Sequence, residues 1–139
     1  MKIAINRCFG GFGISHDAVM RYAELSGITL YPLVEKRGKN GELLCDGSFE
    51  PYKNQKNTCL IHYLTEPLND DGSYVEGSYW SDGNIDRNDP ILIKVIEEMG
   101  SAASDKYAAI EIVEIPDDVD WQIDDYDGQE TVHEVHRSW

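Results

Sequence analysis

The chain contains little that would place it in a membrane or direct it out of the cell. Its apolar runs are short, as in Ile91-Leu92-Ile93, whereas a membrane-spanning helix needs about 20 mostly apolar residues. Met1-Lys2 leads directly into an alternating pattern, without an apolar signal core or a small-residue cleavage site. We therefore expect a soluble, cytoplasmic protein that has no membrane partner.

Cysteine is also scarce. Cys8, Cys45 and Cys59 are an odd number at wide spacings, and no pair forms a C-x-x-C motif. This pattern argues against a disulfide framework and against a structural zinc site built on thiolates. We expect buried free thiols instead.

Positive charge is sparse in the second half of the chain. The net charge is −14, and residues 61–139 hold four Lys/Arg against twenty Asp/Glu, whereas residues 1–60 hold eight against six. Such a surface repels DNA, RNA and anionic lipid. It can attract a basic protein surface or a metal ion, or it can simply keep the protein in solution.

The first half begins with a strand, a glycine-rich turn and a helix. Residues 2–6 alternate and are rich in Ile, which predicts a strand. Ser15 is expected to cap a helix that Gly27 ends. Further strands are expected at 28–34, where Pro32 indicates an edge or a bend, in a hairpin with its tip at 38–41 and its return at 42–45, at 58–64, and at a short edge segment, 78–80.

The second half carries the clearest helix signals. Asp89 can cap a helix that starts at Pro90 and ends at Gly100. A strand is expected at 106–115, and residues 121–126 and 131–135 can pair across Asp127-Gly128. A two-residue loop would place Asp125 opposite Glu130, and like charges repel there, so a short final helix stays open as the alternative.

This order of elements predicts the α+β class. We expect residues 1–139 to form a single domain of 139 residues, long enough for one hydrophobic core. Its architecture is a single mixed or antiparallel β-sheet, with two helices packed mainly on one face.

The turn between the first strand and the first helix is the strongest candidate for a ligand site. Backbone N–H groups at a helix N-terminus can bind an anion, and an arginine can add a charge-assisted bond to phosphate. The glycines do not match the P-loop or the dinucleotide fingerprint, so a turn that only allows close packing is the alternative. The candidate phosphate-binding residues are Arg7, Gly10, Gly11, Gly13 and Ser15.

Three other residue patterns suggest a catalytic or metal site, but each lacks a feature that such a site needs. His133 and His136 lie three residues apart, whereas a zinc protease motif needs four. Residues 124–128 resemble part of a calcium loop, but Ile123 occupies the place of its first aspartate. Cys8 and His16 have no third group to orient the base. We predict no catalytic residues, no metal and no cofactor.

Three aromatic residues, Tyr74, Tyr79 and Trp80, lie in the long polar stretch 65–88. If they are exposed, they would mark a contact site.

Three blocks of the chain resemble a family of small acidic proteins of tailed phages and prophages. They are residues 1–13, residues 87–90, and the ending from Val113 through Asp127-Gly128 to Trp139. The resemblance covers about half the chain and implies an accessory phage gene expressed in a bacterial host cytosol. It carries over no activity and no site residue.

Two functions remain open for a non-enzymatic phage accessory protein with a role against host defence. The first, which we favour from the sequence, is binding of a phosphate-bearing, nucleotide-like small molecule at the glycine-rich turn. The other is inhibition of a host nucleic-acid-binding protein through the acidic segment 111–136, which has ten acids and no Lys or Arg and could imitate the charge of DNA. The partner-binding residues would be Asp117, Asp118, Asp120, Asp124, Asp125 and Asp127.

Overall fold

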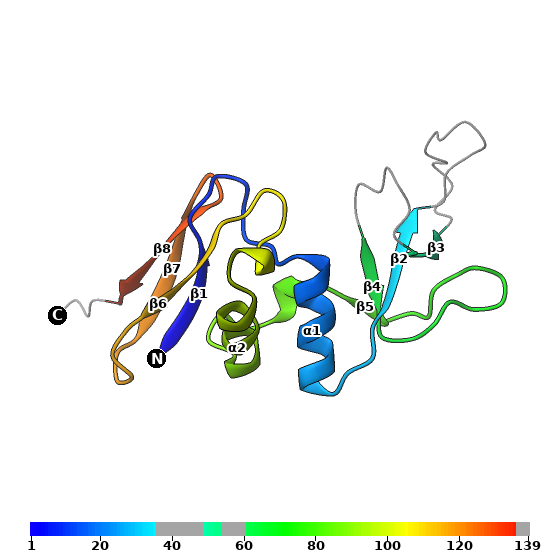
Figure 1. Cartoon of the computed structure of the whole chain (residues 1–139), viewed down its shortest axis with the longest axis horizontal. Helices are drawn as coiled ribbons and strands as arrows, with labels where there is room; N and C mark the ends of the chain where they lie inside the picture. The colour runs from blue at the N-terminus through cyan, green and yellow to red at the C-terminus, as the bar shows by residue number, and fades with distance from the viewer. Residues whose placement is uncertain (36–48, 54–60, 136–139) are drawn as a thin grey trace. The chain divides into compact units, whose positions relative to one another are not determined.

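The computed structural model of the chain describes residues 1–35, 49–53 and 61–135. The chain divides into two compact units, one made of Met1–Ser26 with Asp82–Trp139 and the other of Gly27–Ser81 (Figure 1). We call them unit 1 and unit 2. The hairpin expected at 38–45, the first part of the strand expected at 58–64, and His136 lie outside the described residues.

Unit 1 is built on an antiparallel pair of strands, β1 (Lys2–Asn6) and β6 (Ile110–Glu114). Helix α2 (Pro90–Met99) packs on both strands, and helix α1 (His16–Ser26) packs on α2. A second antiparallel pair, β7 (Trp121–Tyr126) and β8 (Gln129–Glu134), forms a hairpin. Short 3₁₀ helices cover Asp82–Asn84 and Gly100–Ala103.

The helix ends follow the local sequence. The Ser15 hydroxyl accepts from the Ala18 amide at 3.2 Å at the start of α1. Asp89 accepts from the amides of Ile91 and Leu92 at the start of α2. Both expected caps are confirmed, and each supplies an acceptor for N–H groups that the first helical turn leaves unpaired.

The core of unit 1 lies between β1 and the helices. Ile3 and Ile5 from β1, and Leu92 and Val95 from α2, are almost fully buried. Their spacing in the sequence follows the strand period of two and the helix period of 3.6. Within the described ranges, neither helix has the length and apolar character that crossing a membrane requires.

Unit 2 contains a four-stranded antiparallel sheet in the order β3-β2-β4-β5. The strands are β2 (Tyr31–Glu35), β3 (Phe49–Pro51), β4 (His62–Leu64) and β5 (Tyr79–Trp80). Pro32 therefore lies in an inner strand, and the expectation of an edge position is wrong. It is tolerated because it lies just past the last β2–β3 pair, where its carbonyl still accepts from the Tyr52 amide at 2.9 Å.

The α+β class is confirmed, with strands in antiparallel pairings. In the described residues these strands form three antiparallel sheets, β1-β6, β3-β2-β4-β5 and β7-β8, rather than a single sheet. The hairpin alternative for the C-terminal segment is also confirmed. That the whole chain folds as one domain stays a prediction.

Candidate functional site

Three turns meet at one end of unit 1, and glycines make their approach possible. A Cβ on Gly10 would lie 1.9 Å from the Tyr107 carbonyl oxygen, and a Cβ on Gly128 would lie 2.5 Å from the Phe9 oxygen. Any side chain at these positions would force backbone apart. The glycine-rich turn thus packs between the β7–β8 turn and the segment before β6.

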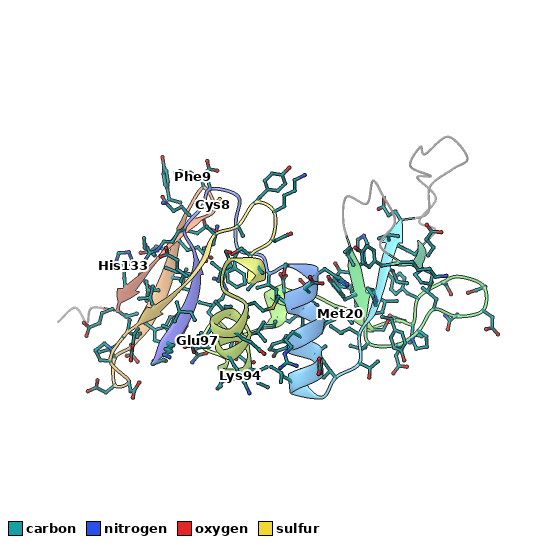
Figure 2. The ribbon with its side chains drawn as sticks, in the orientation of Figure 1. Cys8, Phe9, Met20, Lys94, Glu97 and His133 are labelled. Carbon is teal, nitrogen blue, oxygen red and sulfur yellow. The ribbon has the colours of Figure 1, made fainter. Side chains whose placement is uncertain are left out.

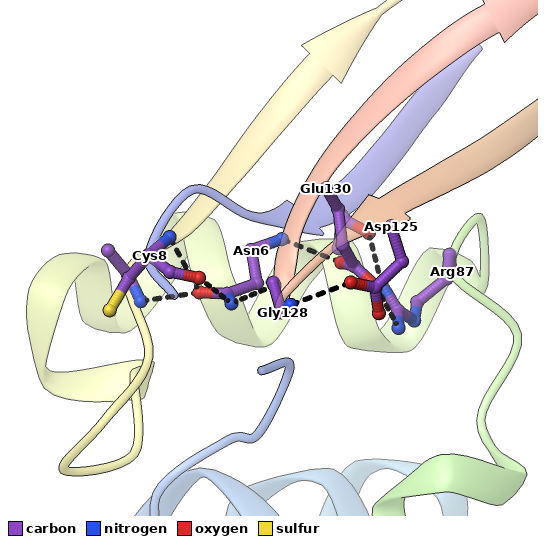
Figure 3. A network of polar contacts seen from close by, with 8 residues as sticks. Asn6, Cys8, Arg87, Asp125, Gly128 and Glu130 are labelled. Carbon is purple, nitrogen blue, oxygen red and sulfur yellow. Dashed lines mark hydrogen bonds and ion pairs between the residues drawn. The ribbon is translucent and has the colours of Figure 1, made fainter. Parts of the chain in front are cut away.

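Asn6, at the end of β1, joins these turns. Its amide nitrogen Nδ2 donates to the carbonyls of Cys8 and Gly128 at 2.6 and 2.7 Å. Its oxygen Oδ1 accepts from the amides of Cys8 and Ala109 at 3.2 and 2.8 Å. Figure 3 shows Asn6 between Cys8 and Gly128. The side chain is fully buried and uses two donor bonds and both acceptor sites.

A partly buried ion pair lies beside Asn6. The Glu130 carboxylate accepts from Arg87 Nη1 and Nη2 at 2.6 and 2.8 Å, and from the Asn6 backbone amide at 2.8 Å (Figure 3). The Arg87 guanidinium carbon lies 3.6 Å from the centre of the Phe12 ring, a stacked arrangement that favours arginine. These contacts anchor the hairpin to β1 and satisfy a carboxylate that is almost fully buried.

The β7–β8 turn is a two-residue turn, Asp127-Gly128, in which both residues have positive φ, 51° and 91°. These angles are typical of a type I′ turn, which matches strand twist. Asp125 does lie opposite Glu130. The expected repulsion is avoided because Glu130 pairs with Arg87, while Asp125 accepts from the Gly128 amide at 2.7 Å.

The candidate phosphate-binding residues already have partners in the chain. Arg7 Nε donates to Glu111 at 3.0 Å, and the Ser15 hydroxyl donates to the Ala102 carbonyl at 2.7 Å while it caps α1. Gly10 faces Tyr107, and Gly11 has a φ of 89° that suits glycine. These residues are neighbours because they follow one another in the turn. Their contacts within the chain explain their presence without a ligand.

Carboxylates lie where a phosphate would be expected near the start of α1. The Ile14 amide donates to Asp82 at 3.1 Å. Asp105 lies beside Gly13, with its Oδ2 atom 3.3 Å from the place of a Cβ. Negative charge is favourable at a helix N-terminus, so this chain supplies its own anion there and would repel a second one.

The candidate partner-binding residues are all exposed. Asp117 accepts from the N-terminal ammonium of Met1, which lowers the pKa of the Asp117 carboxyl. Asp124 lies 3.2 Å from His133. Of these six candidates, three have no side-chain hydrogen bond or ion pair to the described residues and present their charge directly to solvent; these are Asp118, Asp120 and Asp127.

An exposed aromatic group that no sequence pattern indicated lies at the same end of unit 1. Phe9, Tyr107 and Tyr126 are 60%, 67% and 78% exposed. Each belongs to one of the three turns that meet there, and Figure 2 labels Phe9 and Cys8 at this end of the unit. We call these three residues the aromatic tip. The nearest sequence signal is the placement of Phe9 beside glycines and of Tyr126 next to a turn, both typical of surface positions.

Metal and thiol chemistry have no support in the described residues. Among them, no three His, Cys, Asp or Glu side chains are placed to hold a metal ion. The Cys8 thiol is free and half-buried, and it donates to the Tyr107 carbonyl at 3.2 Å. Burial lowers the pKa of His16, against the opposing effect of Asp17. Cys45 and Cys59 lie outside the described residues.

Comparison with known proteins adds no relative. No protein-family model, curated protein or solved structure matches the chain. The resemblance to small acidic phage proteins therefore stays a prediction.

Proposed function

We propose that the protein is a non-enzymatic phage accessory protein that binds and inhibits a host nucleic-acid-binding protein. It uses the acidic segment 111–136 as a substitute for the charge of DNA, and its role is directed against host defence in the bacterial cytosol. The aromatic tip provides the apolar contact. The observation that carries this proposal is the exposed aromatic group beside the acidic segment 111–136, in which six aspartates are exposed.

The two parts of this surface have complementary roles in binding a protein. Aromatic side chains, Tyr above all, are enriched among the residues that contribute most to interface affinity. Unpaired surface carboxylates speed the encounter with a basic partner and select against acidic ones. Only Glu130, among the acids of β7, β8 and their turn, is buried, and it anchors the hairpin. The remaining acids of the hairpin are exposed, and Asp127 among them has no side-chain partner in the described residues.

The hairpin is also held in one conformation, which favours recognition. Asn6 and Gln129 tie its turn to the first strand, through bonds from Asn6 Nδ2 to Gly128 and from Gln129 Nε2 to the Arg7 carbonyl at 3.1 Å. A preorganised surface loses less conformational entropy on binding than a flexible tail does. Charge at fixed positions can follow the phosphate spacing of a nucleic acid better than a disordered acidic tail.

Phosphate binding at the glycine-rich turn has weaker support. Arg7 is already paired with Glu111, and Asp82 accepts from the Ile14 amide near the start of α1. An anion would have to displace one carboxylate and approach the other. If nucleotide binding is nonetheless measured and Arg7→Glu abolishes it, the glycine-rich turn is the site.

The test compares two variants that lose the same charge. The first is Asp118→Asn/Asp120→Asn/Asp127→Asn, which neutralises three exposed acids in unit 1. The matched control, Glu66→Gln/Asp70→Asn/Glu76→Gln, neutralises three exposed acids in unit 2. Each protein is incubated with cleared bacterial lysate, bound proteins are identified by native mass spectrometry, and bound complexes are challenged with duplex DNA.

We expect wild type and control to capture the same nucleic-acid-binding protein, and the first variant to capture much less. Duplex DNA and rising salt should both release the captured protein, because the contact is electrostatic and screened. A Tyr126→Ser variant should weaken capture without changing its salt dependence. Equal capture by both charge variants, or a partner that DNA cannot displace, would refute the proposal.

A further inference from the structure

Unit 2 contains a pocket that no part of the proposed function uses. It has a volume of about 230 Å³ and lies on one face of the four-stranded sheet. Leu33 on β2 pairs with His62 on β4, and Leu64 on β4 pairs with Tyr79 on β5. Directly opposite residues share a face, and so do residues two apart in one strand. Phe49 from β3 also lines the pocket, so every strand contributes to it.

The wall of the pocket is largely aromatic. The Phe49 and His62 rings lie edge to face with centroids 5.2 Å apart, and the His62 and Tyr79 rings are 6.2 Å apart. Leu33 and Leu64 form the buried floor, whereas Tyr79 is 57% exposed at the rim. A planar apolar ring would find aromatic faces and edges on several sides.

One polar atom in this apolar wall has no partner. His62 Nε2 is buried and has no hydrogen bond among the described residues. Leaving a buried polar group unpaired is unfavourable, and most such groups in folded proteins are paired. Because this atom has almost no accessible surface, a ligand's polar atom can satisfy it only when a neighbouring side chain moves, and the exposed Tyr79 ring, 6.2 Å from the His62 ring, is the group that would move.

The loop before β5 contributes Tyr74, the remaining described residue that lines the pocket. Tyr74 lies between two hydrogen-bonded turns. The first turn has bonds from the Asn69 amide to Ser73 and from the Gly72 amide to Asn69, and the second joins Ser78 to Val75. Because the loop is ordered by its own hydrogen bonds, Tyr74 is placed without any ligand.

We propose that this pocket binds a small phenol, a single aromatic ring bearing one hydroxyl group. The size is the first argument, since a cavity of about 150 Å³ already holds benzene and drug-sized ligands need about 300 Å³ or more. The hydroxyl is the second argument, because it both donates and accepts a hydrogen bond and can therefore pair with His62 Nε2 whether or not that nitrogen carries a proton. The ring packs among Phe49, Tyr79 and Tyr74.

The test uses p-cresol and p-xylene, which differ by a hydroxyl in place of a methyl group. Both are titrated into the full-length protein, and binding is followed by NMR through the His62 ring protons and the ligand signals. We expect p-cresol to bind wild type more tightly than p-xylene. In His62→Phe the preference for p-cresol should fall about fivefold, as expected for the loss of one neutral hydrogen bond, whereas His133→Phe, the same change on unit 1, should leave it intact.

A second variant keeps the test decisive if His62→Phe does not fold. Tyr74→Ala removes an exposed wall residue, and it should weaken binding of both compounds by a similar factor. The proposal is wrong if p-cresol shows no binding up to its solubility limit or no preference over p-xylene. It is also wrong if binding persists unchanged in Tyr74→Ala and His62→Phe, because the compounds would then bind elsewhere.

Discussion

Arg87 forms a bidentate ion pair with Glu130, with its two terminal nitrogens 2.6 and 2.8 Å from the carboxylate oxygens, and the Phe12 ring stacks on the guanidinium. The same two residues complete the second edge of β1. The Ala4 amide donates to the Arg87 carbonyl at 2.8 Å, and the Asn6 amide donates to Glu130. An ion pair and one backbone segment thus satisfy strand groups that a neighbouring strand would otherwise pair.

Replacement of Arg87 should lower the stability of the fold strongly. Arg87→Met leaves the buried Glu130 carboxylate without its counter-ion, and we expect a loss of about 3–5 kcal/mol in the free energy of unfolding. Urea denaturation measures it. The added change Glu130→Gln should restore part of the loss, because the amide oxygen still accepts from Asn6.

The matched control for Arg87 is Arg21→Met. Arg21 pairs with Glu24 and Glu98 at the surface, so we expect a change below about 1 kcal/mol. Equal losses in the two variants would contradict a special role for the partly buried pair.

Asn6 should be similarly sensitive. Asn6→Ala removes the partners of the carbonyls of Cys8 and Gly128 and of the Ala109 amide. These bonds are partly buried, so each unpaired group should cost about 1 kcal/mol, the low end of the range for buried groups, and the expected loss in the free energy of unfolding is about 3 kcal/mol. Thermal or urea unfolding checks it, and the exposed Asn88→Ala should stay within about 0.5 kcal/mol of wild type.

The close approach of the turns predicts that alanine substitution destabilises the fold to different extents at two glycines with similar backbone angles. Gly77 has a φ of 79° and open space where a Cβ would lie, whereas Gly128 has a φ of 91° and backbone atoms of Phe9 and Gly11 at 2.5 and 2.6 Å. Gly77→Ala should lose only about 1–2 kcal/mol for the left-handed conformation. Gly128→Ala should lose clearly more in the same urea experiment, and similar losses would mean that the turns do not touch.

Alkaline pH should weaken the contact between the helices. Burial, followed by the hydrogen bond to Asp89 at 2.8 Å, raises the pKa of Tyr22 to about 12. The unfolded chain releases this proton near pH 10, so the folded state binds more protons between pH 10 and 12. The stability that Tyr22 contributes is therefore complete below pH 10 and is lost as pH rises through 12.

Tyr22→Phe tests this dependence. The urea midpoint of wild type should fall more between pH 9 and 11.5 than that of Tyr22→Phe, because the variant has no hydroxyl to titrate at this position. Tyr126→Phe, which changes an exposed tyrosine, should follow wild type. A Tyr22→Phe curve parallel to wild type would refute the assignment.

Local patterns predicted the local structure well. Asp89, Pro90 and Gly100 defined the second helix, and Asp127-Gly128 defined the hairpin, because caps and tight turns depend on neighbouring residues. The fold class followed from the same elements. Pro32 was misplaced, since sequence alone does not reveal where a neighbouring strand ends.

Long-range contacts were beyond those patterns. Asn6 and Gly128 are 122 residues apart, and Arg87 and Glu130 are 43 apart, so no local spacing signals that they meet. The sequence predicted His62 only as part of a strand. It could not predict the pocket that His62 lines, because that pocket is formed by residues from every strand of the sheet. The glycine-rich turn was recognised, but its glycines are explained by backbones that only the folded chain brings close.

The bonds between Asn6 and the β7–β8 turn have a consequence for the order of events on the ribosome. The first strand is made before the groups that satisfy Asn6 and the edge of β1, because these groups come from residues 87, 109, 128 and 130. Unit 2, at residues 27–81, is contiguous and emerges earlier. Unit 1 can complete the second edge of β1 only after residue 130 has left the ribosome, and until then this apolar strand is open to chaperones and to other nascent chains.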